Sequence, residues 1–242
     1  MNAREAEFYK NLEIDEVDKP RAVKALFAKG IEKHILVKNF LLTWRNENKI
    51  RCSEVASTYR YDKRIRNTLF KYISYLEEFY RGLILDAYQS KPSKQHWIKE
   101  LKSYFNEQGK DLNAALEKFE FSRLIIQMLK MPQSIKQKCG LVKKDAGKNA
   151  TAIIELRNAV MHNKFLLLFK GFDICYINGD KSAGLRANII NLANFLPNGV
   201  KEKCLADIDA CKEERDNKGK IKWDLPEQVI VRVWSIADDL RG

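Results

Sequence analysis

Residues 61–89 read YDKRIRNTLFKYISYLEEFYRGLILDAYQ, and the spacing of their apolar side chains decides the fold class. These side chains recur every three or four residues: Ile65, Leu69, Tyr72, Ile73, Leu76, Phe79, Leu83 and Ile84. Such spacing gathers them on one face of an α-helix. The proline-containing segment SKPSKQ follows and ends the pattern. The stretch therefore predicts a long amphipathic helix.

The rest of the chain repeats this helical spacing, and proline is scarce, with five residues in 242. The pattern predicts further helices over 22–49, 95–106, 112–130, 146–169, 184–195, 199–215 and 226–240. One segment, GFDICYINGD at 171–180, fits a short β-hairpin with Asn178-Gly179 as its turn. We expect an all-α protein with room for that hairpin. A single domain over 1–242 is expected, with an acidic segment at 1–20, core helices over 22–169 and a helical extension over 170–242.

The composition is that of a globular protein, with 45% hydrophobic and 31% charged residues. No apolar run is long and uncharged enough to span a bilayer, so we expect no membrane-spanning segment. The acidic N-terminal stretch lacks the apolar segment of a secretion signal. The five cysteines are scattered and form no C-x-x-C pair, so we expect no metal site, no disulfide framework and no cofactor. These features favour a reduced, cytoplasmic protein.

The net charge of +12 is unevenly distributed. Residues 1–20 hold three basic and six acidic side chains, which is 3 − 6 = −3 and leaves +15 for the rest. A balance of this kind favours a polyanionic partner, with nucleic acid first and an anionic membrane surface second. Solubility alone is the competing interpretation. Between 130 and 148 the chain has six lysines and one aspartate, and Lys143, Lys144 and Lys148 directly precede or begin the next predicted helix.

That helix, predicted over 146–169, contains the string ELRNAVMHN at 155–163. Successive helical residues are about 100° apart, so Ile153, Leu156, Val160 and Leu167 form its core stripe. Asn158 and His162 are i,i+4 neighbours on the opposite side, where their side chains can touch. On a continuous helix Phe165 and Phe169 share the face of His162. This second apolar stripe predicts a second packing surface.

An arginine and a histidine in this pattern suit RNA cleavage. Imidazole exchanges protons near neutral pH, and guanidinium offers a fork of donors to phosphate oxygens. A base would help the ribose 2′-OH to attack phosphorus while the arginine steadies the developing charge. The competing interpretation is an Arg–Glu pair and a hydrogen-bonded histidine with structural roles. Spacing alone leaves both open.

The string resembles the R-N-x-x-x-H signature of HEPN-domain ribonucleases, with Arg157, Asn158 and His162 at the signature positions. The helix over 61–89 is similar to the long helix of the Abi (abortive infection) branch of that family. Its matching positions are Asp62, Ile65, Arg66, Glu77, Tyr80 and Arg81. The two stretches cover well under a third of the chain. Met161 and Asn163 beside the histidine depart from the branch's usual pattern, and the tail after Lys170 has no match.

The resemblance implies a HEPN-like bundle with a four-helix core and extra helices, usually a homodimer. It implies a metal-independent endoribonuclease active in phage defence or a toxin–antitoxin system. Arg157 and His162 would be the catalytic pair, and Asn158 would position the histidine. A restraining antitoxin protein or small non-coding RNA is an expected partner besides RNA. The alternative is a related module that binds RNA or protein without cleaving.

Other residues have expected roles beside the motif. Arg66, Arg81, Lys143, Lys144 and Lys148 are candidates for RNA binding, although each arginine could equally pair with a helix carboxylate and the lysine segment could be an ordinary solvated loop. A buried Glu77 would need a partner, for which Arg157 is a candidate. Phe165 and Phe169 are the candidates for a dimer interface.

Overall fold

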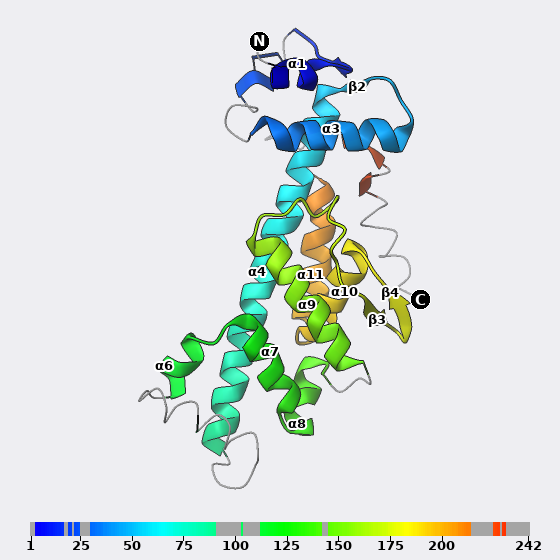
Figure 1. The fold of residues 1–242 in the computed structure, drawn as a ribbon. Coiled ribbons are helices and arrows are strands. Elements are labelled where there is room, and N and C mark those ends of the chain that lie inside the picture. Colours follow the sequence, from blue (N-terminus) through cyan, green and yellow to red (C-terminus); the bar gives the residue numbers. More distant parts are fainter. Residues whose placement is uncertain are drawn as a thin grey trace. The chain divides into compact units, whose positions relative to one another are not determined.

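The structure is a computed structural model that describes residues 3–16, 19–20, 22–24, 30–90, 103, 112–141, 145–213, 225–227 and 229–230. The protein is mostly helical with a few short strands, which confirms the expected all-α class (Figure 1). The chain divides into two compact units. The first comprises Met1–Ile65 with Asp209–Gly242, and the second comprises Arg66–Ile208. These limits differ from the expected segment boundaries at residues 20 and 169.

The first unit contains α1 (Ala3–Tyr9), α3 (Ile31–Arg45) and the start of α4 (Cys52–Ser90). Two short strands, β1 (Leu12–Glu13) and β2 (Ile50–Arg51), pair in parallel, with Leu12 opposite Ile50. The sequence pattern did not predict this pair. The buried ammonium of Lys38 on α3 donates to the carbonyls of Glu7 and Lys10 at the end of α1. The carbonyl groups at the C-terminal end of a helix have no partner within that helix, and at the end of α1 this side chain of α3 supplies one.

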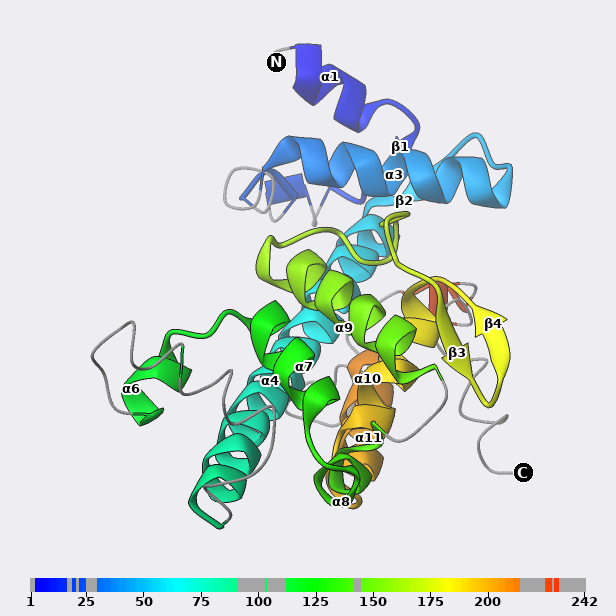
Figure 2. The ribbon, with the colours of Figure 1, turned by 60° about the horizontal axis from the view of Figure 1, so that its bottom comes forward.

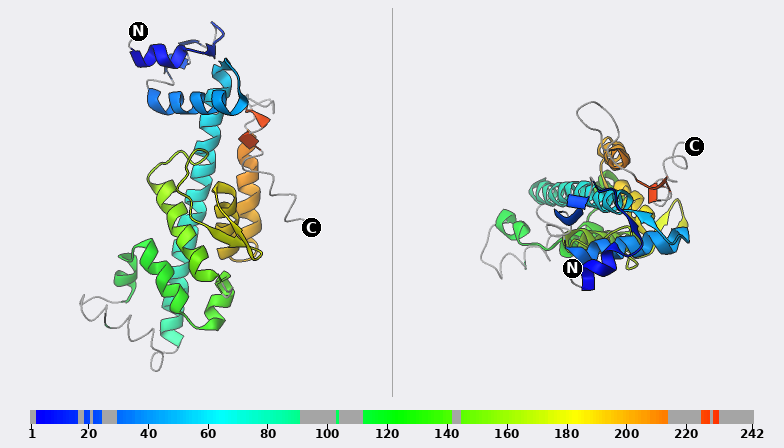
Figure 3. Two further views of the ribbon diagram at one scale, coloured as in Figure 1. Left: turned by 45° about the vertical axis from the view of Figure 1, so that its right-hand side comes forward. Right: turned by 90° about the horizontal axis from the view of Figure 1, so that it is seen from above.

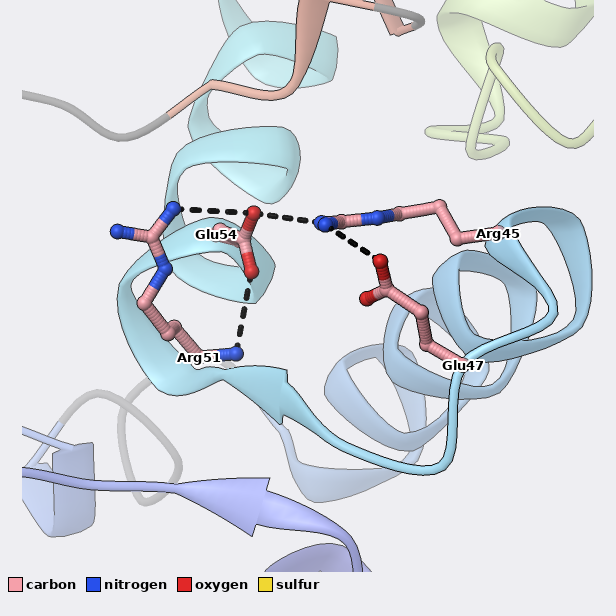
Figure 4. A network of polar contacts seen from close by, with 4 residues as sticks. All are labelled: Arg45, Glu47, Arg51 and Glu54. Carbon is pink, nitrogen blue, oxygen red and sulfur yellow. Dashed lines mark hydrogen bonds and ion pairs between the residues drawn. The ribbon is translucent and has the colours of Figure 1, made fainter.

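A polar network fixes the start of α4 (Figure 4). The buried carboxylate of Glu54 accepts from the backbone amide of Arg51 at 3.1 Å and from the guanidinium of Arg45 at 2.7 Å. Burial alone would raise the pKa of Glu54, but the hydrogen bonds from Arg51 and Arg45 outweigh it and lower the pKa. The Glu54–Arg51 bond is one half of a capping box, in which the third helical residue returns to the amide before the helix. This cap explains why α4 begins nine residues before the predicted start at 61.

The second unit is built on the remainder of α4, whose predicted apolar face is buried at Leu69, Ile73 and Leu76. Its other helical elements are α6 (Leu112–Glu117), α7 (Phe121–Lys130), α8 (Gln133–Lys136), η1 (Gln137–Cys139), α9 (Ala146–Met161), α10 (Leu185–Phe195) and α11 (Val200–Asp209). Helix α9 packs against α7 on one side and α10 on the other (Figures 1 and 2). Helix α11 lies beside α4, where Asp207 accepts from Lys71 and Tyr72 (Figure 3).

The predicted hairpin is confirmed. Strands β3 (Cys175–Ile177) and β4 (Asp180–Ser182) pair antiparallel across Asn178 and Gly179. Both turn residues have positive φ, 52° and 95°, which is the backbone of the tight hairpin turn that Asn-Gly favours. The side-chain amide of Asn149 on α9 bonds both backbone groups of Tyr176, at 2.7 and 3.0 Å, and so joins the hairpin to the helix.

Several predicted helix limits were wrong. The helix predicted over 22–49 is described as residues 22–24 and α3, and the one over 112–130 is broken at 118–120 between α6 and α7. The helix predicted over 199–215 is α11 followed by η2 (Ala210–Lys212). Most of the predicted helices over 95–106 and 226–240 lies outside the described residues.

The motif helix was predicted too long, because α9 stops at Met161 rather than continuing to 169. Asn163 takes the left-handed conformation, with φ 52°. The amide of Asn163 then donates to the carbonyl of Val160, and the amide of Lys164 to that of Ala159. This is the Schellman pattern of a helix end, with asparagine in the place that glycine usually holds. The run of apolar residues after 163 concealed this stop signal.

Candidate active site at the end of helix α9

The three motif residues occupy the C-terminal end of α9. Arg157 and Asn158 lie on its last turns and are half-buried, while His162 is the cap residue and is exposed. The backbone amide of His162 donates to the carbonyl of Asn158 at 2.9 Å. Among the described residues, no hydrogen bond, ion pair or ring contact engages the imidazole. The histidine is therefore held by its backbone, and its ring is open to solvent.

The turn that presents His162 is attached to α4. Arg66 is buried and donates to the carbonyl oxygen of Asn163 at 3.0 Å. A charged donor on a carbonyl is a strong anchor in a buried position. Arg66 was a candidate for phosphate binding. Its contact with Asn163 instead suits a role in positioning the residue next to the histidine.

Arg157 faces away from His162. Five residues correspond to about 140° around the helix, so the two side chains of one chain diverge. The Arg157 guanidinium lies over the ring of Phe121, with its carbon 5.9 Å from the ring centre. Its Nη1 is 3.5 Å from Oδ1 of Asn158, whereas its Nε is buried without an acceptor. The expected contact of Asn158 with His162 is not found among the described residues, and the amide oxygen of Asn158 meets Arg157 instead.

Arg157 and Asn158 line a cavity of about 560 Å³ between α4, α9 and the break from α6 to α7. Its other lining residues are Glu77, Arg81, Glu117, Lys118, Phe119, Glu120, Phe121, Ser122 and Ile154. Three basic and three acidic side chains are present, so the cavity has no excess of positive charge. His162 does not belong to the lining. The cavity suits a ligand with both donors and acceptors better than it suits a bare anion.

Arg81 is tied to the wall of this cavity. Its Nε donates to the carbonyl of Leu116 at 2.9 Å, and its Nη2 donates to the carbonyl of Phe119 at 3.0 Å and to Glu77 at 2.8 Å. Two carbonyls at the break between α6 and α7 are thereby satisfied. Glu77 takes Arg81 as its partner, not Arg157 as the sequence suggested. A phosphate would have to compete with all three acceptors for Arg81.

The lysine candidates have different outcomes. Lys143 and Lys144 lie outside the described residues, so their role in RNA binding stays a prediction. Lys148 is exposed, and its ammonium donates to the hydroxyl of Tyr176 at 3.1 Å. It also lies 4.7 Å from the centre of that ring. The hydrogen bond with Tyr176 raises the pKa of Lys148. The lysine therefore remains charged at the edge of the hairpin.

The premise for Phe165 and Phe169 as a helical dimer face was wrong. Both residues follow the end of α9, so they share no helix face with His162. The ring of Phe169 packs edge-on against Phe172, with centres 4.9 Å apart, and covers Gly171, where a Cβ would come within 2.7 Å of it. Phe169 thus packs within its own loop. The interface role of these two residues stays a prediction without its original geometric support.

Phe121 and the cavity beside it were missed at the sequence level. Phe121 begins α7 directly after Glu120, and this helix start has no side-chain cap. A break there is signalled only by the polar pair Glu117-Lys118 inside an otherwise helical pattern. The sequence does not show which ring lies under Arg157, because that depends on how α7 and α9 cross. The periodicity of a single helix does not predict how it crosses another.

Comparisons of this chain with known proteins found no relative. The sequence matches no protein-family model, and no curated protein and no solved structure matches it significantly. The likeness to HEPN ribonucleases therefore rests on the quoted motif residues alone. Within the described part of the chain, no helix combines the length and the apolar character that crossing a membrane would require.

Proposed function

We propose that this protein is a metal-independent endoribonuclease that uses Arg157 and His162. The observation that carries the proposal is the presentation of His162, whose ring is exposed on a turn fixed by Asn163 and anchored by Arg66. A general base needs an accessible nitrogen, which the exposed ring offers, and the turn fixes the backbone that carries this ring. Abortive infection or toxin–antitoxin systems in the cytoplasm are the setting that the motif resemblance suggests.

The proposed reaction is an internal transfer at phosphorus. The imidazole of His162 takes the proton of the ribose 2′-OH, whose oxygen attacks the adjacent phosphorus. The bond from phosphorus to the 5′ oxygen breaks, and that oxygen receives a proton from an imidazolium or from water. A 2′,3′-cyclic phosphate and a 5′-OH result. A guanidinium of Arg157 would stabilise the charge that builds on the phosphate oxygens during the attack.

A second copy of the chain is part of the proposal. Because Arg157 and His162 diverge by about 140° in one chain, a phosphate does not readily meet both of them. A two-fold interface over the end of α9 would bring Arg157 of one protomer towards His162 of the other. Such a homodimer requires neither Phe165 nor Phe169 at the interface.

The alternative is a module that binds RNA or a protein without cutting. It is favoured by the contacts of Arg157, which meets Asn158 and Phe121 and lines the cavity with mixed charges. An arginine with these contacts can stabilise the fold without taking part in catalysis. The two candidates differ in whether labelled RNA is cut.

The test is cleavage of labelled single-stranded RNA by the wild type, His162→Ala and Arg157→Ala, in EDTA. We expect wild-type cleavage with a 2′,3′-cyclic end, and a loss of roughly 10²–10⁴-fold in each variant. The melting temperature of His162→Ala should be unchanged because the ring is exposed. RNA binding without cleavage by the wild type would favour the alternative. Activity that EDTA abolishes and a divalent metal restores would overturn the mechanism.

Mixing the two inactive variants tests the shared site. If each site takes Arg157 from one protomer and His162 from the other, a mixed dimer contains one intact site. After subunit exchange we expect about a quarter of wild-type activity, since about half of the dimers are mixed and half of their sites are intact. A mixture that stays inactive, although exchange is verified with labelled protomers, would place both groups in the same chain.

A further inference from the structure

Phe70 is a large aromatic residue that the motif does not include. It lies on α4 inside the second unit, and half of its surface, 50%, is exposed. Among the described residues, no other ring stacks on it and no cation lies over its face. The predicted apolar face of α4, in contrast, is buried at Leu69 and Ile73. Phe70 is therefore outside the core, and half of its surface is open to solvent.

The position of Phe70 on α4 relates it to the candidate active site. It lies about 40° around the helix from Arg66, and about 20° from both Glu77 and Arg81. Arg66 holds the turn that carries His162, while Glu77 and Arg81 line the cavity at Arg157. Along the axis Phe70 is about 6 Å from Arg66 and about 10 Å from Glu77. Along α4, Phe70 therefore lies between the residue that anchors the His162 turn and the residues that line the cavity at Arg157.

We propose that Phe70 is a stacking platform for a base of single-stranded RNA, beside the phosphate that His162 addresses. The inference rests on the proposed function and specifies its substrate class. An aromatic ring stacks on any base, because every base has a π-face, so recognition of this kind tolerates sequence. A base inside a duplex already stacks on its neighbours and is not free to meet a side chain. The platform therefore selects unpaired RNA over a duplex.

The charged neighbours of Phe70 are consistent with a stacking site. Arg66 and Arg81 are occupied by backbone carbonyls, and Arg81 also by Glu77, so neither offers an unengaged fork to a phosphate along this strip. A base of a strand that crosses here would add stacking energy on the exposed ring to the electrostatic attraction of the whole protein. Base stacking on an aromatic side chain changes affinity about 5- to 150-fold when the ring is removed.

The test measures binding separately from cleavage. The probe is a labelled single-stranded RNA with 2′-O-methyl groups, which removes the attacking hydroxyl, and anisotropy gives its affinity for the full-length protein. Phe70→Ala should weaken binding about 5- to 150-fold. Phe70→Trp keeps an aromatic ring at this position and should bind as tightly as the wild type. Tyr75→Ala is the matched control, because Tyr75 is also an exposed aromatic of α4, 39% exposed, but lies about 140° away around the helix. This control should bind like the wild type.

The outcomes separate the two proposals. If Phe70→Ala binds the RNA as tightly as the wild type does, and the two proteins have equal melting temperatures, the stacking platform is wrong. The nuclease proposal would be unaffected by this result. An RNA duplex that binds as tightly as the single strand and weakens by the same factor in Phe70→Ala would also overturn it. A loss of self-association in place of RNA affinity, seen by sedimentation, would reassign Phe70 to a protein interface. A wild type that neither binds nor cuts RNA would defeat the proposed function itself.

Discussion

Asparagine is the residue that this chain uses where the backbone turns left-handed. Outside glycine, every described residue with positive φ is an asparagine: Asn11, Asn46, Asn163 and Asn178. Asparagine tolerates this conformation better than other side chains because its short amide can bond locally. Asn163 is the consequential case, since it stops α9 immediately after His162. The identity of a single residue thus determines where the candidate general base is presented.

Substitution at position 163 should change stability according to backbone preference. Asn163 is exposed, so its side chain contributes little by burial. Asn163→Val should lower the free energy of unfolding by about 1–2 kcal/mol, because a β-branched residue is strained at positive φ. Asn163→Gly is the matched control and should be close to neutral. Urea titrations followed by circular dichroism measure both. Equal stability of the two variants would mean that the turn has another conformation in solution.

The motif residues show what sequence can predict at this scale. The pattern correctly predicted the buried face of α9 at Ile153, Leu156 and Val160, while the catalytic roles of Arg157, Asn158 and His162 stay predictions. It misjudged the contacts of Asn158 and Glu77, because side-chain partners depend on where neighbouring helices cross. Arg66 and Arg81 show the same limit. Their partners are carbonyls at helix ends, and a sequence pattern does not show which carbonyls are left unpaired.

At the scale of helices, α4 and α11 are joined by one carboxylate. Asp207 of α11 accepts from the ammonium of Lys71 at 2.8 Å and from the hydroxyl of Tyr72 at 2.7 Å. The hydrogen bonds from Lys71 and then Tyr72 lower the pKa of Asp207 from 3.8 to about 2. Asp207 remains partly exposed, and solvent screens such pairs. We therefore assign the pair about 1 kcal/mol, less than the shift alone would give.

This pairing predicts a dependence of stability on pH. Because the folded pKa lies below the unfolded value, the contribution is complete above about pH 5 and is lost as pH falls from 4 towards 2. Asp207→Asn should therefore lose less stability than the wild type between pH 7 and pH 3, by roughly 0.5 kcal/mol, since about half of the contribution is lost at pH 3. Urea unfolding at both values measures this. Glu78→Gln, which removes an exposed carboxylate of α4, is the control and should follow the wild type.

Helix existence was predictable, and helix ends were less so. Periodicity found the buried face of α4, and it placed α10 within a residue of its observed limits. The early start of α4 depends on Glu54, whose cap partners lie in the preceding segment. The parallel pair of β1 and β2 is two residues long, too short for alternation to be visible. Ends and short strands are set by hydrogen bonds between segments, which periodicity does not encode.

At the scale of the whole molecule, the net charge of +12 should dominate the affinity for RNA. Binding to a polyanion releases counterions, so the logarithm of affinity falls linearly with the logarithm of salt concentration. Lys143→Glu with Lys144→Glu should weaken binding and flatten this slope by about 0.7 for each phosphate that the variant no longer neutralises. Lys33→Glu with Lys49→Glu changes the net charge equally in the first unit and is the control. Equal slopes for the two double variants would leave 143 and 144 as an ordinary solvated loop.

The bond between Asn149 and Tyr176 also has a consequence for aggregation. One edge of β3 is paired with β4, and the side-chain amide of Asn149 occupies the backbone N–H and C=O of Tyr176. A free strand edge is a template on which another chain can add a strand. Asn149→Ala should open that edge, so the variant should form thioflavin-positive assemblies on prolonged incubation, while Thr151→Ala on the same helix should not. If the Asn149→Ala protein stays monomeric, contacts other than the Asn149 amide keep further strands from pairing with this edge.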